Sequence, residues 1–123
     1  MNVVDSSAWM EYFIDGPNAS YFSEVIEKVT DLLVPTICIY EVFKKVSKDR
    51  GEAAAFDAIS QMKLGKVIDL DEDTALIAAR ISIAHKLPMA DSMILAVARA
   101  SQATLWTQDD DFSGISGVRY RPA

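Results

Sequence analysis

The stretch Ala103–Ser113 reads ATLWTQDDDFS and joins an apolar run to three consecutive aspartates. Its β-branched and aromatic residues predict a strand over residues 103–108 that ends in a turn. Aspartates crowded at the end of a strand repel one another and resist joint ionisation. By itself the stretch fits two interpretations, a solvated turn or one corner of a site that holds a cation. The rest of the chain has to decide between them.

The size and composition of the chain indicate one domain. It has 123 residues, half of them hydrophobic, which is enough for a core of its own. The single cysteine, Cys38, cannot form an intrachain disulfide, and this favours a reducing compartment. The sequence shows neither a signal peptide nor an apolar run of membrane-spanning length. We therefore expect a cytoplasmic protein with no membrane partner.

The formal net charge of -6 argues against a general nucleic-acid binder, because nucleic acids are polyanions. This argument weakens if several of the carboxylates lie in one cleft as metal ligands, since bound divalent cations cancel their charge locally. The position of the acids therefore matters more than their number.

Alternating strand and helix signals along the chain predict an α/β fold. Apolar runs bounded by turn residues predict strands at residues 2–5, 32–35, 66–70 and 103–108, with a short edge strand at 117–121. Helical spacing of apolar residues predicts helices that begin near residue 8 and cover 18–30, 36–48, 52–63, 74–86 and 89–102. Strands that alternate with helices form a mostly parallel sheet, and function in such sheets gathers at the carboxyl ends of the strands.

Several helix starts carry residues suited to capping. Ser6 and Ser7 precede the first predicted helix, and Thr36 precedes the third. The acidic triplet at residues 71–73 directly precedes the helix predicted at 74–86, where N-capping and the helix dipole favour carboxylates. We expect this triplet to have a structural role alone.

Asp91 is harder to explain by capping. Positions three, four and seven residues later are apolar, so Asp91 shares the core-facing side of its helix. An inward carboxylate needs a partner, because an unpaired buried charge costs several kcal/mol. Asp5 ends the first predicted strand, at the edge of the sheet where ligands bind. Both residues are therefore candidates for a functional site.

Glu41 lies opposite the apolar stripe of its predicted helix, on a side that becomes basic with Lys44, Lys45 and Lys48. One interpretation is a solvated face supported by Glu–Lys pairs four residues apart. The other is the rim of a cleft, with the carboxylate aimed inward and the lysines aimed at a polyanion. Spacing alone leaves both open.

The period of two along the last strand places Thr107 and Asp109 on one side. Asp110 points away, and the direction of Asp111 depends on the turn. His85 is the only histidine, so a histidine-rich zinc site is excluded, and Cys38 is expected in the core. What remains is an oxygen-only ligand set that suits Mg²⁺ or Mn²⁺: Asp5, Glu41, Asp91, Asp109 and, as a further candidate, Asp111.

Four motifs together resemble the PIN-domain family, and within it the short VapC toxins of toxin–antitoxin pairs. The motifs are VVDSSAW at the N-terminus, VPTICIYEV around Glu41, LPMADSMILAVA around Asp91 and LWTQDDDFSGISGV near the C-terminus. Each is short, but their order, spacing and total length are specific. The resemblance implies a single PIN domain over residues 1–123. Its expected fold is a three-layer α/β/α sandwich around a mostly parallel sheet of four to five strands.

The resemblance also implies roles for individual residues. The acidic catalytic quartet is matched by Asp5, Glu41, Asp91 and Asp109, and of these Asp5, Asp91 and Asp109 are the expected metal ligands. Supporting positions are matched by Ser6, Thr107 and Asp111. Tyr40 and Met89 depart from the commoner pattern beside the site but leave its acids intact.

The implied activity is Mg²⁺- or Mn²⁺-dependent endonucleolytic cleavage of RNA by the toxin of a type II toxin–antitoxin system, with one or two ions in the site. The implied partners are an RNA substrate, a cognate antitoxin and a second copy of the chain in a homodimer. Lys44, Lys45 and Lys48 are candidate RNA contacts. A non-catalytic PIN module that binds RNA or protein is the main alternative. A phosphoryl-transfer enzyme with Asp5 as nucleophile is another, although Ser7 stands where it would need a second aspartate.

Overall fold

A single sheet of five parallel strands forms the centre of the computed structural model, which describes residues 1–123. The strands lie in the order β3-β2-β1-β4-β5. Their bounds are β1 (Asn2–Val4), β2 (Leu32–Pro35), β3 (Lys66–Ile68), β4 (Thr104–Thr107) and β5 (Val118–Tyr120). The predicted α/β fold is confirmed, and all five strands pair in parallel.

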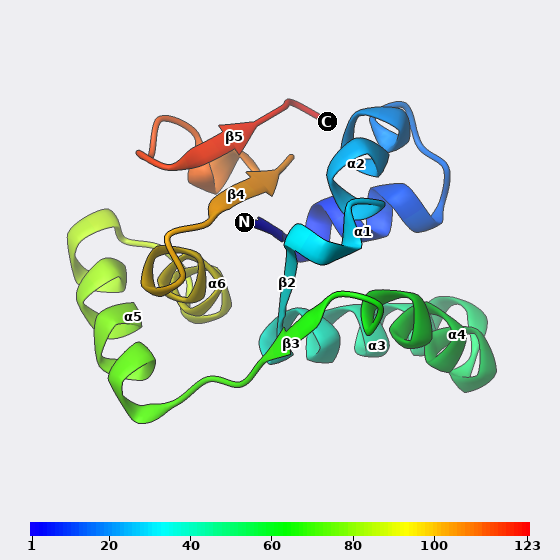
Figure 1. Ribbon diagram of the computed structural model, residues 1–123, viewed down its shortest axis with the longest axis horizontal. Helices are drawn as coiled ribbons and strands as arrows, with labels where there is room; N and C mark the ends of the chain where they lie inside the picture. The colour runs from blue at the N-terminus through cyan, green and yellow to red at the C-terminus, as the bar shows by residue number, and fades with distance from the viewer.

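Six α-helices cover the two faces of this sheet. They are α1 (Ser6–Phe13), α2 (Ala19–Ile26), α3 (Thr36–Arg50), α4 (Glu52–Met62), α5 (Glu72–His85) and α6 (Met89–Ala100). Figure 1 shows α5 and α6 on one side of the strands and α1 to α4 on the other. Because crossovers between parallel strands are right-handed, reversing the direction of strand addition moves the helices to the opposite face.

That reversal occurs between β1 and β4. The chain adds β2 and β3 on one side of β1, then returns through α5 and α6 to add β4 and β5 on the other side. Loops leaving β1 and β4 therefore diverge to opposite faces and leave a crevice at the carboxyl ends of these two neighbouring strands. Open parallel sheets bind their ligands at such a switch point.

The core lies on both faces of the central strands. β1 is flanked by β2 and β4, and its Val3 and Val4 are fully buried, as are Val34 of β2 and Leu105 of β4. These residues belong to one cluster of 25 buried hydrophobic side chains. Continuous apolar runs are expected for strands covered on both sides, and they explain why the short strands were recognisable in the sequence.

Several predicted helix ends need correction. The first helix begins at Ser6, because the Asp5 carbonyl accepts hydrogen bonds from the amides of Ala8 and Trp9 at 3.0 Å each. Thr36 is the first helical residue rather than the N-cap, a position that Pro35 takes. The helix predicted over 18–30 ends at Ile26 and is followed by a short 3₁₀ helix, Val29–Asp31.

The acidic triplet at residues 71–73 has the structural role that the sequence predicts, although α5 begins at Glu72 rather than at Thr74 and includes two of the three acids. The Asp71 side chain accepts a hydrogen bond from the Thr74 amide at 2.8 Å and caps the helix. Bonds from Thr74 lower the pKa of this exposed carboxyl, since they favour its charged form. The prediction for this triplet is confirmed.

α5 and α6 pack closely against each other and are joined by three residues, 86–88. None of the helices is by itself long and apolar enough to cross a membrane. By length and composition, α5 and α6 pass that test only together, as a pair bent by 118°.

Replacing Leu105 by alanine should lower the free energy of unfolding by about 2–5 kcal/mol, because the residue is fully buried in β4 and its loss leaves a cavity. Leu64→Ala is the matched control, since Leu64 is 69% exposed, and it should change the same free energy by less than about 0.5 kcal/mol. Urea denaturation followed by circular dichroism measures both. Equal losses in the two variants would contradict the position of β4 in the core.

Candidate metal centre

Five acidic side chains from four separate places in the sequence meet at the carboxyl ends of β1 and β4. Asp5 follows β1 directly, and Asp109 follows β4 and precedes a 3₁₀ helix, Asp110–Phe112, that contains Asp111. Glu41 comes from the second turn of α3, and Asp91 from the first turn of α6. Each of the other four acids raises the pKa of Asp91 through its charge, which places all five in one cluster.

Asp5 is the most deeply buried of these acids and is held by two hydroxyl groups. It is 2% exposed, and its Oδ2 accepts hydrogen bonds from Ser7 Oγ at 2.6 Å and Thr107 Oγ1 at 2.8 Å. Burial raises the pKa of its carboxyl, the two hydroxyls lower it, and the charges of Asp109 and Glu41 raise it further. Since both hydroxyls bind the same oxygen, Oδ1 is left for another ligand.

Thr107 connects this carboxylate to the neighbouring acid. Its Oγ1 donates to Asp5 and accepts a hydrogen bond from the Asp109 amide at 3.0 Å. The pleat of β4 turns Leu105 and Thr107 to the same side, where both are fully buried. Thr107 therefore sets the position of Asp109 relative to Asp5 as well as the orientation of the Asp5 carboxylate.

Glu41 is oriented by the other serine of the N-terminal motif. Ser6 Oγ donates to Glu41 Oε1 at 2.7 Å, and this bond joins the start of α1 to α3. The two consecutive serines thus serve two different acids, and neither caps α1 with its side chain. The capping role predicted for them is wrong, because α1 begins at Ser6 and the N-cap position falls on Asp5.

The pKa of Asp91 is also raised by its surroundings. Burial, followed by the charges of Asp5, Asp109, Glu41 and Asp111, raises its pKa to about 7. The residue is half-buried, on the side of α6 that also presents the buried Ile94 and Leu95. Its inward direction agrees with the helical spacing in the sequence.

The closest grouping of ligand atoms is formed by Asp91, Asp109 and Asp111. One carboxylate oxygen from each lies within 4.8 Å of the others. Asp109 Oδ1 accepts a hydrogen bond from the Asp111 amide at 3.0 Å, and this local turn brings Asp111 beside the other two. The intervening Asp110 is exposed and lies outside the grouping. Asp5 and Glu41 lie farther out but remain electrostatically coupled to Asp91.

No basic side chain neutralises these acids. The one ion pair in the protein joins Lys45 to Asp49 on α3 at 3.2 Å. Lys44 lies 5.8 Å from the centre of the Tyr40 ring, and Lys48 is exposed farther along the same helix. Lys44 and Lys48 therefore have no acidic partner, whereas Lys45 is paired with Asp49, and the assignment of the three lysines to RNA binding stays a prediction.

The donor set fits a hard divalent cation. Every ligand that converges is a carboxylate oxygen, which suits Mg²⁺ or Mn²⁺. His85 is exposed at the end of α5. Cys38 is buried, donates weakly to the Val4 carbonyl at 3.7 Å, and has a thiol pKa raised chiefly by burial. Uncompensated carboxylates with a raised pKa are the expected state of a site that binds a cation.

Ser7 is a site residue that the sequence interpretation missed. It was considered as a helix cap and as the absence of a second aspartate, yet it makes the shortest hydrogen bond to Asp5. A usable signal exists in the sequence. A helix that starts directly after Asp5 places the residue two positions on in its first turn, where a short hydroxyl can reach back to the carboxylate.

Comparisons with known proteins agree with this geometry. A family model described as the PIN domain matches residues 3–118. The chain belongs to the PIN-domain family. The resemblance noted in the sequence is thereby confirmed, and this PIN domain has the fold of VapC-type toxins. No curated protein matches the sequence.

Solved structures of similar fold cover almost the whole PIN domain. A toxin–antitoxin complex from Klebsiella pneumoniae matches with a TM-score of 0.83 and 23% identity over 100% of both chains. VapC20 from Mycobacterium tuberculosis, described as a sarcin–ricin loop cleaving toxin, matches with 0.80 and 18% over 99% of this chain and 100% of its own. FitAcB from Neisseria gonorrhoeae matches with 0.76 and 21% over 99% and 98%. At these identities the likeness establishes the fold.

In the metal-free protein, Asp91→Asn should stabilise the fold at pH 8 by about 1–2 kcal/mol. The pKa of Asp91 is raised from 3.8 to about 7 in the folded state, so its contribution is most favourable below pH 3.8 and is lost as the pH rises to 7. Asparagine does not titrate, and the advantage of the variant should therefore vanish near pH 4. The figure is smaller than about 1.4 kcal/mol per pKa unit would give, because solvent screens this half-exposed group.

Chemical denaturation between pH 4 and pH 8 in the presence of EDTA measures this effect. Asp110→Asn is the matched control, because this exposed neighbour lies outside the cluster, and its stability should follow that of the wild type. An Asp91→Asn protein that is no more stable than the wild type at pH 8 would contradict the coupling among the acids.

Proposed function

We propose that this PIN domain is a Mg²⁺- or Mn²⁺-dependent endoribonuclease and the toxin component of a type II toxin–antitoxin system. The observation that carries the proposal is the convergence of five carboxylates, without a basic partner, at the switch point between β1 and β4. Such a cluster destabilises the protein unless it binds cations, and RNA cleavage assisted by a metal ion is a reaction that uses them.

The residues of the cluster have separable roles in this reaction. Asp91, Asp109 and Asp111 would hold a divalent cation together, and Asp5 would add its free Oδ1. When bound, the cation supplies Lewis acidity toward a phosphate oxygen and lowers the pKa of an attacking water. Ser7 and Thr107 fix the Asp5 carboxylate, and Ser6 fixes Glu41, so the acids are oriented before substrate arrives.

The choice of RNA as substrate rests on the family and not on the geometry alone. VapC20 from M. tuberculosis is described as cleaving the sarcin–ricin loop, but its 18% identity establishes only a shared fold. A non-catalytic binding module would have no use for carboxylates that repel one another in a half-buried cluster. A phospho-aspartate mechanism fits poorly, because Asp5 is 2% exposed and Ser7 stands where a second aspartate would be needed.

The decisive experiment compares RNA cleavage by the wild type, Asp91→Asn and Asp110→Asn. Wild-type cleavage of a labelled RNA should require Mg²⁺ or Mn²⁺ and stop on addition of EDTA. Asp91→Asn should lose activity by about 100-fold or more, because it removes a charged ligand of the cation. Asp110→Asn removes the same charge from an exposed neighbour and should retain activity within a few-fold.

Titration calorimetry with Mn²⁺ provides a readout that does not depend on turnover. The wild type and Asp110→Asn should bind Mn²⁺, and Asp91→Asn should bind it at least about 10-fold more weakly. Full nuclease activity of Asp91→Asn would refute the proposal. Tight Mn²⁺ binding without RNA cleavage would favour the non-catalytic alternative.

We further propose a protein antitoxin as partner, since several similar folds were solved in toxin–antitoxin complexes.

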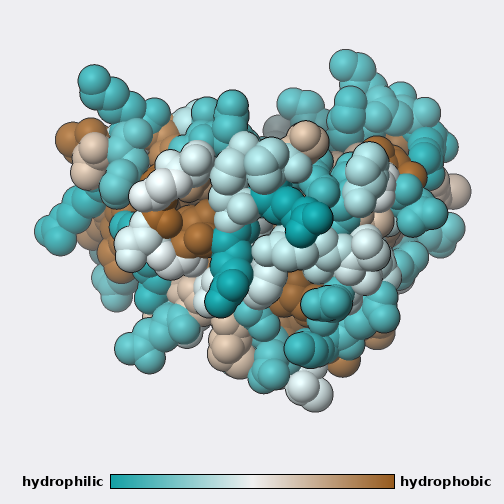
Figure 2. Space-filling model, turned by 90° about the horizontal axis from the view of Figure 1, so that it is seen from above, coloured by the Kyte–Doolittle hydropathy of each residue, from teal (hydrophilic) through white to brown (hydrophobic).

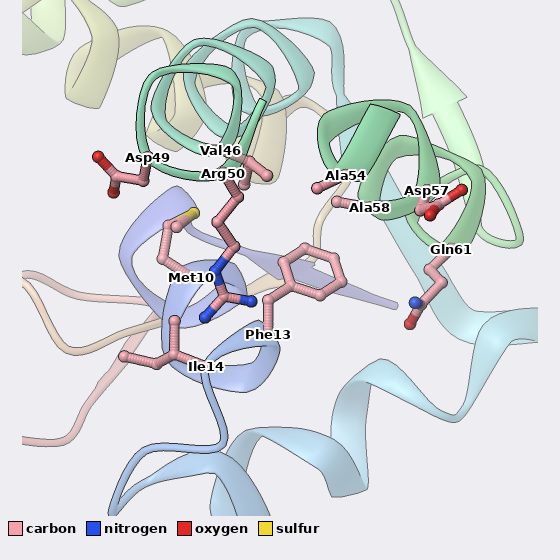
Figure 3. A pocket seen from close by; sticks show the side chains of 10 residues that line it. All are labelled: Met10, Phe13, Ile14, Val46, Asp49, Arg50, Ala54, Asp57, Ala58 and Gln61. Atoms are coloured by element: carbon pink, nitrogen blue, oxygen red, sulfur yellow. The ribbon is translucent and has the colours of Figure 1, made fainter. Parts of the chain in front are cut away.

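A surface feature suited to such a partner is a cavity of about 310 Å³ between α1 and the α3–α4 pair. Figure 3 shows Phe13 and Met10 on one side of it, Ala54 and Ala58 on the other, and the Arg50 side chain extending from α3 between Met10 and Phe13. Apolar walls with a polar rim fit an apolar side chain from a bound peptide. An arginine of the antitoxin that enters the acidic cluster would compete with the cation for the same carboxylates, because both carry positive charge.

Co-purification from cells that express both proteins tests this partner. Ala54→Arg places a long side chain in the cavity and should abolish recovery of the antitoxin. Ala53→Arg makes the same change at an exposed neighbouring position of α4 and should leave recovery intact. Full recovery of the antitoxin with Ala54→Arg would show that the antitoxin does not dock at this cavity. The homodimer expected from the resemblance stays a prediction.

A further inference from the structure

Four side chains form a continuous stack beside β4 and β5, which we call the arginine–aromatic stack: Arg119, Trp106, Tyr21 and Arg121. The Arg119 guanidinium lies 5.4 Å from the centre of the Trp106 ring. The Trp106 ring lies 5.6 Å from that of Tyr21, and the Arg121 guanidinium lies 4.5 Å from the Tyr21 ring. The stack therefore presents two positive charges at its ends and two aromatic rings between them.

The register of the sheet creates this stack from residues far apart in the sequence. Trp106 of β4 pairs in parallel with Arg119 of β5, so their side chains project from the same face. The Arg121 amide donates to the Thr107 carbonyl at 2.9 Å, which continues the same alternation beyond β5. α2 lies over this face and contributes Tyr21.

Hydrogen bonds hold the end of the stack in place without neutralising it. Arg121 Nε donates to Asn18 Oδ1 at 3.1 Å, while Asn18 Nδ2 donates to Gln108 Oε1 at 3.1 Å and to the Pro122 carbonyl at 2.9 Å. Asn18 is 8% exposed, so the anchor is rigid. Trp106 Nε1 donates to Asn2 Oδ1 at 2.8 Å and fixes the ring. Arg121 is thus held by a neutral hydrogen-bond partner, and Arg119 contacts a ring that is itself fixed.

The two guanidinium groups have no acidic partner in the protein. Arg119 and Arg121 are exposed, and the only ion pair of the chain lies on α3. This is unusual in a chain with a net charge of -6, where carboxylates outnumber basic residues. A groove of about 540 Å³ runs beside Arg119 between Tyr21 and Tyr120. The face seen from above, to which β5 belongs, is mainly hydrophilic (Figure 2).

The position of the stack relates it to the acidic cluster. Arg121 is hydrogen-bonded through its amide to Thr107, the residue whose hydroxyl holds Asp5 and whose Oγ1 accepts from Asp109. Gln108, which lies between Thr107 and Asp109, is bonded to the same Asn18 that holds Arg121. The stack therefore starts beside the cluster and leads away from it along β5.

We propose that the arginine–aromatic stack binds single-stranded RNA next to the phosphate that is cleaved, an inference that rests on the function proposed above. Exposed guanidinium N–H groups in a fixed orientation suit phosphate oxygens, and aromatic rings at the edge of a groove suit unstacked bases. An acidic peptide would use the arginines but gain nothing from the rings. RNA is therefore the occupant that uses every element of this surface.

Fluorescence anisotropy with a labelled single-stranded oligouridylate, measured in EDTA to prevent cleavage, tests the surface. The double variant Arg119→Gln, Arg121→Gln should bind on the order of 10-fold more weakly than the wild type at 0.1 M salt. The slope of log affinity against log salt should fall by about 1.4, or about 0.7 for each lost phosphate contact. Arg80→Gln, an exposed arginine on α5 across the sheet, should bind like the wild type.

Tryptophan fluorescence gives a local readout of the same event. Trp9 is fully buried, so a change on adding RNA reports Trp106, and Trp106→Phe should abolish that change while Mn²⁺ binding stays intact. Unchanged RNA affinity and salt slope in the double variant would overturn the proposal. Competition by polyglutamate at equal charge concentration, with no change in Trp106 fluorescence on adding RNA, would also overturn it in favour of an acidic protein segment. If the stack binds RNA but the protein has no nuclease activity, the proposed RNA-binding surface is supported and only the proposed endoribonuclease function is refuted.

Discussion

Repulsion among carboxylates at the carboxyl ends of β1 and β4 is the constraint on which the rest of this structure depends. Asp5 is buried, Asp91 has a pKa near 7, and no lysine or arginine is paired with either. An arrangement of this kind lowers the stability of the metal-free protein, and a cation that binds the folded state alone restores it. The core and the switch point hold these acids together, as do the starts of α1, of α6 and of the 3₁₀ helix Asp110–Phe112.

Neutral donors orient the acids and leave their charge in place. Ser7 and Thr107 donate to Asp5, Ser6 donates to Glu41, and the Asp111 amide donates to Asp109. A lysine at any of these positions would form an ion pair and compete with a metal ion for the carboxylate. Hydroxyl and amide donors restrict rotation instead, which preserves affinity for a divalent cation and reduces the reorganisation needed to bind it.

The two acidic triplets of the chain, residues 71–73 and 109–111, show what sequence can explain and what only the structure can explain. Both span the start of a helical segment, and each places its first aspartate as the N-cap, Asp71 of α5 and Asp109 of the 3₁₀ helix. They differ in what surrounds them. Asp71 lies in solvent, whereas Asp109 and the neighbouring Asp111 lie next to Asp91 of α6. Local capping signals are identical in kind, so only long-range packing separates a structural triplet from a functional one.

The sequence by itself determined the strands, the helices and the α/β class, because burial on both faces of a parallel sheet leaves short apolar runs and amphipathic helices that any such fold requires. It also indicated Asp5 and Asp91, whose positions relative to an apolar strand and an apolar helix face are local properties. Tertiary structure decided the rest. The bond between Ser6 and Glu41, the approach of Asp91 to Asp109 and the joining of Arg119 and Arg121 through two aromatic rings depend on strand order and register. These are contacts between distant segments, and no local pattern specifies them.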